Sequence, residues 1–314
     1  MKIVLLDALT FGDTDLSAFE AFGEVEVFQT TSPQQTKERI TNADVIVTNK
    51  VVIDDTLMAG ASKLKLICVA ATGTNNIDLK AAHKRGIEVK NVSGYSTHSV
   101  VQHTFSMLFY LIGHSGYYDS YVKNGSYSKS PIFTDVSRSF FEIEGKRWGI
   151  IGLGEIGRSV AKVAEAFGAE VCYTSTSGQN STQEYMRLEL DTLLKTSDII
   201  SIHAPLNEKT RNLLGYEQLL ICKDGAVVLN LGRGGIVDEE AVARIIDTKE
   251  ILVGLDVLAQ EPMRENHPLL RVKNHENLYI TPHIAWTSVE AREKLIEGVV
   301  HNIQTFLEHD ASQK

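Results

Sequence analysis

Short apolar runs with the composition of β-strands alternate with segments of helical periodicity along nearly the whole chain. Strands that are separated by helices pair in parallel through right-handed crossovers, and the helices then cover both faces of the sheet. The alternation therefore predicts an α/β fold with doubly wound parallel sheets. The predicted strands are residues 2–6, 25–28, 45–48, 66–70, 88–91, 147–151, 170–173, 199–203, 226–230, 252–255 and 278–280. The clearest helical segments are residues 99–112, 158–167 and 239–246.

The length and composition are those of a globular protein of about two domains. Of the 314 residues, 40 are Asp or Glu and 31 are Lys or Arg, which gives a formal net charge of −9. Because a nucleic-acid-binding surface usually carries the opposite sign, we expect no nucleic acid partner. No apolar run reaches the roughly 18 residues of a membrane span, and the N-terminus lacks the apolar core of a signal peptide. We therefore expect a cytoplasmic protein that binds no membrane.

The cysteines argue against covalent cross-links and against a metal. Cys68, Cys172 and Cys222 are odd in number, and none of them belongs to a C-x-x-C pair. Neither a disulfide framework nor a thiolate zinc site is indicated by this spacing. We expect a reducing compartment and no bound metal.

Two segments interrupt the regular alternation. Residues 117–139 are rich in Tyr, Ser, Gly and Lys, and they are predicted to form a long loop that crosses between domains or reaches a second subunit. Residues 288–307 have the pattern of an amphipathic helix after the last strand. Its isolated position would let this helix return to the first domain.

Three glycines follow the predicted strand 147–151 and open a helix. Gly152 permits a tight turn, Gly154 lets a pyrophosphate approach the backbone, and Gly157 lets helix and strand pack closely. The N-terminus of the helix then offers free N–H groups and partial positive charge to phosphates. The alternative is a plain glycine-rich turn, but a strand before it and a helix after it favour dinucleotide binding.

One expected partner of this turn is missing. An acid that binds the adenosine ribose usually lies about 20 residues further on, after the next strand. That place holds Ser175, Thr176 and Ser177, with neither an acid nor an Arg. The hydroxyls fit a ribose 2′-hydroxyl or a 2′-phosphate, and a plain polar turn is the alternative. The choice between NAD and NADP therefore stays open.

Three ionisable residues each follow a predicted strand further along the chain: Arg233, Glu261 and His283. The carboxyl ends of strands face the ligand crevice in a doubly wound sheet, so an Arg, an acid and a His would converge there. Each alone has a simpler interpretation as a surface charge, a solvated loop carboxylate or a structural histidine. Their occurrence together beyond one dinucleotide turn favours a site, in which Arg233 would pair with a carboxylate.

Several motifs together resemble the D-isomer-specific 2-hydroxyacid dehydrogenases. This family includes glycerate dehydrogenases, hydroxypyruvate and glyoxylate reductases, and phosphoglycerate dehydrogenases. The resemblance covers nearly the full length. The motifs that carry it are the glycine turn, residues 71–78, 94–96, 102–104, 197–210, 230–238 and 255–257, and Pro282 with His283.

The resemblance implies two Rossmann-like domains, with the cofactor domain inserted into the substrate domain. Residues 1–100 and 286–314 would form the substrate domain, and residues 101–285 the NAD(P)-binding domain. The active site would lie between them. Family members are usually dimers, so a homodimer with residues 117–139 at the interface is implied.

The resemblance also assigns catalytic roles. Arg233 would bind the substrate carboxylate and polarise the C2 oxygen, while backbone N–H groups around Thr72 and Gly73 would hold the carboxylate from the other domain. His283 would exchange a proton with the C2 oxygen, and Glu261 would orient and charge its imidazole. Lys50 resembles a residue near the substrate, although a solvated loop lysine is the alternative.

Cofactor contacts carry over in the same way. Amides of Glu155 and Ile156 would bind the pyrophosphate, and Ser175 and Thr176 the adenosine ribose. Asp256 would bind the nicotinamide carboxamide. The other implied cofactor contacts are Thr104, Gly152, Gly154, Gly157, His203, Ala204, Pro205, Thr210, Leu231, Gly232 and Ala285.

The implied function is transfer of a hydride between NAD(P)H and a small 2-keto acid, giving a D-2-hydroxy acid. Hydroxypyruvate, glyoxylate and glycerate are the favoured substrates. The alternative is a dinucleotide-sensing, corepressor-like binding protein with the same fold. A formate dehydrogenase would be expected to carry Gln in place of Glu261. The missing ribose acid is one departure from the family pattern, and a spacing from Arg233 to Glu261 about one residue shorter than in some relatives is another.

Overall fold

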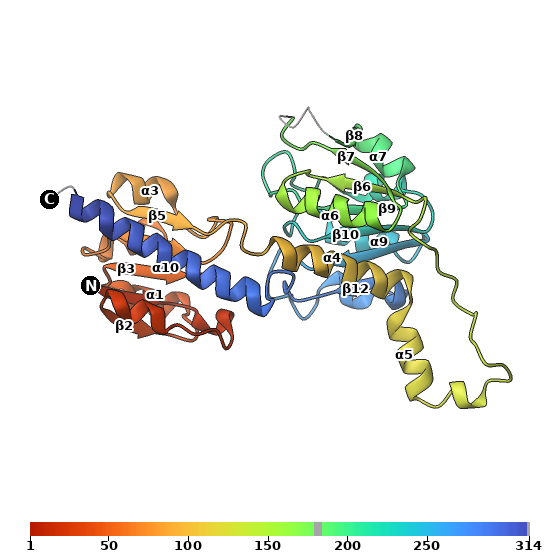
Figure 1. Ribbon diagram of the computed structural model, residues 1–314, viewed down its shortest axis with the longest axis horizontal. Helices are drawn as coiled ribbons and strands as arrows, with labels where there is room; N and C mark the ends of the chain where they lie inside the picture. Colours follow the sequence, from red (N-terminus) through yellow and green to blue (C-terminus); the bar gives the residue numbers. More distant parts are fainter. Residues whose placement is uncertain (179–183, 313–314) are drawn as a thin grey trace. The chain divides into compact units, whose positions relative to one another are not determined.

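The computed structural model describes residues 1–178 and 184–312. The chain forms two units: Met1–Ser96 together with the chain from Thr287 onward, and Thr97–Trp286. Each unit is a layered α/β body with helices packed on a central sheet (Figure 1).

A five-stranded sheet in the order β2-β1-β3-β4-β5 is the centre of the first unit, and its strands all pair in parallel. Its three inner strands are nearly continuous in apolar residues, as expected for a parallel sheet that is covered on both faces, whereas the two edge strands also carry Glu, Lys or Asn. The strands are β1 (Lys2–Leu5), β2 (Glu24–Val27), β3 (Val45–Thr48), β4 (Leu66–Val69) and β5 (Glu88–Asn91).

Helices from both ends of the chain cover this sheet. The helices α1 (Pro33–Ile40), α2 (Asp55–Gly60) and α3 (Leu79–Lys84) supply apolar side chains to one core. The last helix, α10 (Val289–Ser312), packs against β4 and β5. There Lys90 Nζ donates a hydrogen bond to Thr305 Oγ1 at 2.9 Å, and Asn302 Nδ2 donates one to the Asn91 carbonyl at 3.0 Å. The C-terminal helix therefore belongs to the unit that begins the chain. Two 3₁₀ helices, η1 (Ala8–Phe11) and η2 (Ser17–Phe22), complete this unit.

The second unit is built on a seven-stranded sheet in the order β12-β11-β10-β9-β6-β7-β8, again parallel throughout. Its strands are β6 (Arg147–Ile151), β7 (Glu170–Thr174), β8 (Met186–Arg187), β9 (Ile199–Ile202), β10 (Ala226–Asn230), β11 (Ile251–Leu255) and β12 (Leu278–Ile280). The order reverses between β6 and β9, which makes this the point where ligands bind in open α/β sheets.

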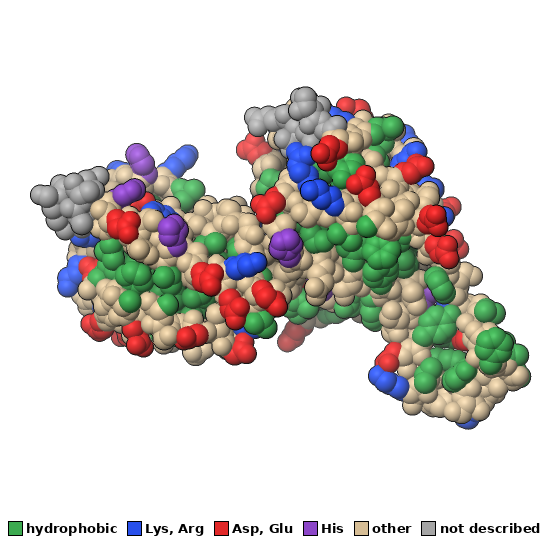
Figure 2. Space-filling model, viewed as in Figure 1, with side chains coloured by type: hydrophobic (Ala, Val, Ile, Leu, Met, Phe, Trp, Pro, Cys, Tyr) green, Lys and Arg blue, Asp and Glu red, His purple; other side chains and the backbone are tan. Residues whose placement is uncertain are grey.

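The prediction of a long loop that crosses between domains is wrong for residues 117–139, whereas its alternative, a contact with a second subunit, stays a prediction. Ser115–Lys123 form the helix α5 and Tyr127–Lys129 the 3₁₀ helix η3, and the whole segment lies inside the second unit, so it does not cross between domains. None of the residues of α5 is buried. A helix that buries no face needs no apolar stripe, so its sequence does not show the pattern that predicts a helix. The segment projects from its unit and carries many apolar side chains on its surface (Figures 1 and 2).

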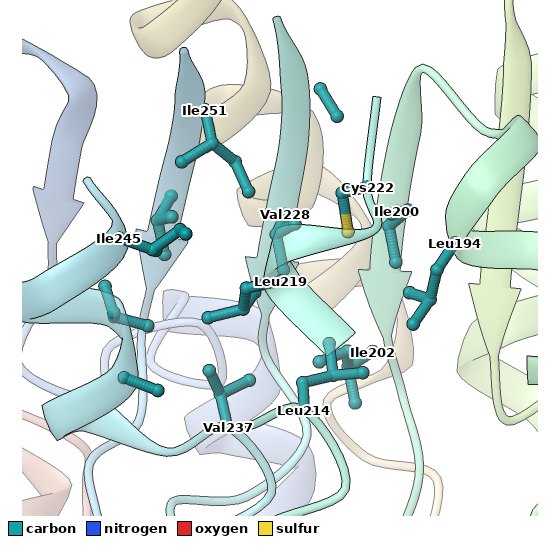
Figure 3. Close-up of a cluster of buried hydrophobic side chains, with 14 of the residues drawn as sticks. Leu194, Ile200, Ile202, Leu214, Leu219, Cys222, Val228, Val237, Ile245 and Ile251 are labelled. Carbon is teal, nitrogen blue, oxygen red and sulfur yellow. The ribbon is translucent and has the colours of Figure 1, made fainter. Parts of the chain in front are cut away.

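Two cores lie on opposite faces of the larger sheet. On one face α4 (Thr97–Ile112) and α6 (Glu155–Ala166) pack against Trp148, Ile150 and Leu229. On the other face, shown in Figure 3, α7 (Leu190–Thr196), α8 (Tyr216–Leu220) and α9 (Glu239–Ile245) bury Ile200, Ile202 and Val228. The remaining 3₁₀ helices are η4 (Pro268–Arg271) and η5 (His275–Asn277).

The predicted parallel α/β architecture is confirmed in both units, and each predicted strand is present with ends that differ by at most one residue. The strand β8 is not among the predicted strands, because its two residues are exposed and too few to show a period. The helix α6 begins three residues before its predicted start, since the turn glycine Gly154 is already the N-cap of that helix.

Other expectations concern membranes, metals and cysteines. Within residues 1–178 and 184–312, no helix is long and apolar enough to cross a membrane. In the same part of the chain, no three His, Cys, Asp or Glu side chains cluster as a metal site would need. Cys68, Cys172 and Cys222 are free and buried.

The smaller sheet reverses its order between β1 and β3, where Asp7 joins the two strand ends. Its buried carboxylate accepts hydrogen bonds from the Asn49 N–H at 2.9 Å and the Lys50 N–H at 2.7 Å. The Thr48 hydroxyl also donates to it at 3.2 Å. One carboxylate therefore holds the whole turn after β3.

Replacing Asp7 with Ala leaves these two backbone N–H groups without an acceptor. We expect Asp7→Ala to lower the free energy of unfolding by about 2–4 kcal/mol, since each unsatisfied buried group costs about 1–3 kcal/mol. Urea denaturation measures this change. Asp15→Ala is the control. That exposed carboxylate accepts hydrogen bonds from the N–H and the hydroxyl of Ser17, and water can take its place as acceptor, so its loss should cost about 0.5 kcal/mol or less. Equal midpoints for the two variants would contradict the account.

Candidate active site

The glycine turn lies between β6 and α6, next to the point where the strand order reverses. Gly152 has a φ of +94°, and a Cβ atom there would lie 2.9 Å from Ala204 Cα. A Cβ atom on Gly157 would lie 2.4 Å from the Gly152 carbonyl oxygen. Both positions therefore accept glycine alone.

Gly154 differs, because a Cβ atom there would meet no heavy atom within 4 Å. The glycine leaves open backbone at the start of α6, where the N–H groups of the first turn have no acceptor within the helix. The side chain of Glu155 points to the start of α4, where its Oε1 accepts a hydrogen bond from Thr97 Oγ1 at 2.7 Å. The exposed backbone and the helix dipole suit an anionic diphosphate.

The loops after β7 and β9 reach the same edge of the sheet. Ser175 and Thr176 follow β7 directly, and Ser175 Oγ accepts a hydrogen bond from the Gly178 N–H at 3.1 Å. Pro205 follows β9 and accepts a hydrogen bond from Thr210 Oγ1 at 2.7 Å, which closes that loop. The hydroxyl of Ser175 and the Pro205–Thr210 loop are thus already shaped by internal hydrogen bonds.

Two of the residues with implied cofactor roles point into the protein. Thr104 is fully buried in α4, and its hydroxyl donates to the Val100 carbonyl at 2.8 Å. His203 follows β9, and its Nε2 lies 3.1 Å from Ser201 Oγ, which also accepts from the Trp148 indole N–H at 2.9 Å. The buried Nδ1 of His203 has no hydrogen-bond partner among the described residues. Burial lowers the pKa of His203 to about 3, so the ring is neutral at pH 7.

Arg233 lies in the loop that follows β10, and Asn230 shapes this loop. The Gly232 N–H donates to Asn230 Oδ1 at 3.1 Å, and Asn230 Nδ2 donates to the Arg233 carbonyl at 3.0 Å. Arg233 Nη1 donates to the Gly232 carbonyl at 2.8 Å. A guanidinium has five N–H groups, so this single bond fixes its direction and leaves donors for a planar anion.

Glu261 and His283 form a hydrogen-bonded pair beside that loop. His283 Nδ1 lies 2.7 Å from Glu261 Oε2, and the Leu258 N–H donates to Glu261 Oε1 at 3.0 Å. The loop after β11 also touches the loop after β10, since a Cβ atom on Gly234 would lie 1.9 Å from the Leu258 carbonyl oxygen. Arg233, Glu261 and His283 are thus connected through Gly234 and Leu258.

Asp256 holds the backbone that carries His283. Its main-chain oxygen accepts from the His283 N–H at 2.8 Å. Its Oδ1 accepts from the Ile284 N–H at 2.8 Å, and its Oδ2 accepts from the Ala285 N–H at 3.0 Å. The side chain is only 1 % exposed. His283 has a φ of +56°, a left-handed conformation that is unfavourable for a histidine and is held here by three consecutive N–H bonds.

The residues with implied substrate contacts belong to the first unit. Lys50 lies in the turn that Asp7 organises. Thr72 follows β4, and its carbonyl accepts from Asn91 Nδ2 at 2.6 Å while its hydroxyl donates to the Val92 carbonyl at 3.3 Å. Gly73 is the next residue along this loop.

Asn230 and Asp7 shape the loops of Arg233 and Lys50, and neither residue is among the site residues predicted from the sequence. Asn230 lies in the stretch 230–238 that carries the family resemblance, so that motif was the available signal. Asp7 follows the predicted strand 2–6 directly, and the three ionisable candidates lie in the loops that follow predicted strands. The groups to which Asn230 and Asp7 form hydrogen bonds, however, are defined only by the tertiary structure.

The neutral, half-buried ring of His203 makes stability depend on pH. Between about pH 3 and about pH 6.5 the unfolded chain binds a proton that the folded protein does not, so stability falls as the pH falls. From about pH 7.5 to about pH 5 we expect the wild type to lose about 2 kcal/mol more unfolding free energy than His203→Asn. Urea denaturation at the two pH values measures the difference. His98→Asn, an exposed site on α4, should retain the wild-type slope, whereas equal slopes for wild type and His203→Asn would refute the assignment.

Comparison with known proteins shows which family this chain resembles. Residues 105–285 match the family model described as the NAD binding domain of D-isomer specific 2-hydroxyacid dehydrogenases. A hydroxypyruvate reductase of Blautia hydrogenotrophica is 36% identical, over 98% of this chain and 97% of the relative. A glycerate dehydrogenase of Methylorubrum extorquens is 35% identical, over 98% of this chain and 96% of the relative.

A solved structure extends the likeness to the fold of the whole chain. The D-lactate dehydrogenase of Aquifex aeolicus, crystallised with NAD and lactic acid, superposes with a TM-score of 0.84 at 26% identity. The match covers all of this chain and 97% of that structure. From the matched model, the full-length relatives and the shared fold, we conclude that this chain belongs to the D-isomer specific 2-hydroxyacid dehydrogenase family.

Proposed function

We propose that this protein is an NAD(P)-dependent oxidoreductase that reduces a small 2-keto acid to the D-2-hydroxy acid, with hydroxypyruvate and glyoxylate as the favoured acceptors. The observation that carries the proposal is the His283–Glu261 pair at 2.7 Å, connected to the loop of Arg233. A proton donor and a carboxylate-binding cation lie in one set of loops, which is what such a reduction requires.

The residues at the edge of the larger sheet fit a nicotinamide dinucleotide. The open backbone at Gly154 and the first-turn amides of Glu155 and Ile156 suit its diphosphate. The hydroxyls of Ser175 and Thr176 would contact the adenosine ribose, and Asp256 would contact the carboxamide. The loops with Ala204, Pro205, Leu231 and Gly232 would complete the contacts. When bound in its reduced form, this cofactor supplies the hydride.

His283 would be the group that exchanges the proton. A carboxylate is only an acceptor, so the Glu261 contact keeps a proton on Nδ1 and leaves Nε2 to face the substrate. In the reduction, Nε2 of the charged ring gives its proton to the C2 oxygen, and Glu261 stabilises that charged ring. In the oxidation, Nε2 of the neutral ring takes the proton back.

Arg233 would bind the substrate carboxylate and polarise the C2 oxygen. Its remaining N–H groups form a planar fork that matches a carboxylate, and its charge persists at every physiological pH. In the first unit, Lys50 and the backbone around Thr72 and Gly73 are proposed as further substrate contacts.

We extend the proposal to a cytoplasmic homodimer. The segment that projects from the second unit exposes apolar side chains that water solvates poorly (Figure 2). Phe133 is 89 % exposed, and Val136 and Phe140 are also exposed. A second copy of this segment is the partner that the proposal assigns to this surface.

A dinucleotide-sensing, corepressor-like protein is the alternative function for this fold. Such a protein needs the glycine turn but not a proton donor. The Arg233, Glu261 and His283 set favours the enzyme, and activity assays separate the two.

Arg233→Ala removes the charged partner of the substrate carboxylate. We expect kcat/KM to fall by about a hundredfold to a thousandfold, since loss of one partner of such a pair costs about 3–4 kcal/mol. Initial rates with saturating NADH or NADPH measure the loss. Arg271→Ala, at an exposed site in η4, should leave kcat/KM unchanged. A near-normal value for Arg233→Ala would remove this residue from the site.

A panel of acceptors tests the function itself. We expect oxidation of NADH or NADPH with hydroxypyruvate or glyoxylate to be faster than with pyruvate or 2-oxoglutarate, and His283→Ala to abolish it without loss of cofactor binding. Preference for NADPH would mean that the hydroxyls of Ser175–Ser177 hold the 2′-phosphate, and preference for NADH that they only replace the missing acid. Cofactor binding without turnover of any acceptor would instead support the sensing protein.

A further inference from the structure

The segment Thr281–Ala285 carries His283, and side chains of the helix α4 form hydrogen bonds with both ends of this segment. Ser99 Oγ donates a hydrogen bond to the Ala285 carbonyl at 2.6 Å. One turn further along the same face of α4, His103 Nε2 lies 3.0 Å from Thr281 Oγ1. Neither Ser99 nor His103 has a role in the proposed function.

The hydrogen bonds define which nitrogen of His103 carries the proton. The Thr281 hydroxyl donates its single proton to Asp256 Oδ1 at 2.6 Å. Its oxygen can therefore only accept from His103, which places a proton on Nε2 of that ring. The same Nε2 lies 3.5 Å from Asp256 Oδ1. Burial lowers the pKa of His103, and the charge of Asp256 acts in the opposite direction.

These contacts lead directly to the backbone of His283. Asp256 Oδ1 accepts from both Thr281 Oγ1 and the Ile284 N–H, so a displaced Thr281 hydroxyl displaces the carboxylate. The carboxylate in turn holds the N–H groups on the C-terminal side of His283 and stabilises its left-handed φ of +56°. A rotation of that backbone would turn Nε2 away from its working direction.

We propose that His103 and Thr281 are positioning residues that orient the His283 imidazole by fixing the Asp256 carboxylate. The inference rests on the proposed function, in which His283 exchanges a proton with the substrate. Neither residue is assigned a contact with the substrate in the proposed function, so their loss should weaken the chemical step more than binding. The carboxylate of Asp256 then has a second task besides any contact with the cofactor.

Paired substitutions separate positioning from simple stability. His103→Leu and Thr281→Val remove the polar contacts, whereas His103→Gln and Thr281→Ser keep a donor and a hydroxyl. We expect His103→Leu and Thr281→Val to lower kcat about tenfold to a hundredfold, because small displacements of a reacting group cost that much. KM for hydroxypyruvate and Kd for the nicotinamide cofactor should change less than about threefold. The Gln and Ser variants should recover most of kcat, and the exposed His98→Gln should match the wild type.

A spectroscopic readout does not depend on turnover. The Nδ1–H proton of His283, held by Glu261, should give a downfield proton resonance in the wild type and in the Gln and Ser variants. We expect this resonance to broaden or vanish in His103→Leu and Thr281→Val, provided that circular dichroism shows them folded.

The outcomes distinguish the inference from the function on which it rests. A wild type that reduces no keto acid contradicts the proposed function. The Nδ1–H resonance of His283 then tests by itself whether His103 and Thr281 orient the imidazole. An active wild type whose kcat and resonance are unchanged in His103→Leu and Thr281→Val overturns the inference. Losses of stability without rescue by Gln or Ser overturn it as well.

Discussion

The carboxyl edge of the seven-stranded parallel sheet is the constraint on which the site depends. Parallel strands all end at the same edge, so the loops after β6, β9, β10 and β11 must share one small space. Their backbones approach so closely that Gly152 lies against Ala204 and Gly234 against Leu258. Side chains cannot fit between these loops, and the glycine turn, Arg233 and Glu261 acquire fixed relative positions as a result.

Buried carboxylates hold the loops in place by hydrogen bonds, as backbone hydrogen bonds hold the strands. Asp256 in the second unit and Asp7 in the first each follow a parallel strand and accept N–H groups from a neighbouring loop. A carboxylate has room for about four hydrogen bonds, so a single side chain organises a turn that has no regular structure. Both turns bear residues with proposed roles, His283 and Lys50. The fold thus uses buried carboxylates to fix irregular backbone next to residues with proposed roles.

Local sequence pattern accounts for the strands and for the three ionisable candidates, but not for the contacts that orient them. The strands are predicted because the inner strands of a parallel sheet are nearly continuous in apolar residues and the edge strands are still rich in β-branched ones. Arg233, Glu261 and His283 are predicted because each follows a strand. The helix α5 is missed because it has no buried face. The bond between His103 and Thr281 spans 178 residues of sequence, and no local period encodes a pair of that separation. The roles of the site residues themselves remain predictions.

The residues with proposed chemical roles and the residues with proposed substrate contacts belong to different units, and this division bears on how such proteins diverge. The glycine turn, Arg233, Glu261 and His283 all belong to Thr97–Trp286, whereas Lys50, Thr72 and Gly73 belong to the other unit. Under the proposed function, the loops of the first unit can drift in sequence and alter the accepted side chain of the acid, while the machinery for hydride and proton remains untouched. Substrate range and reactivity are then separately evolvable, since mutations that change one need not disturb the hydrogen bonds that support the other.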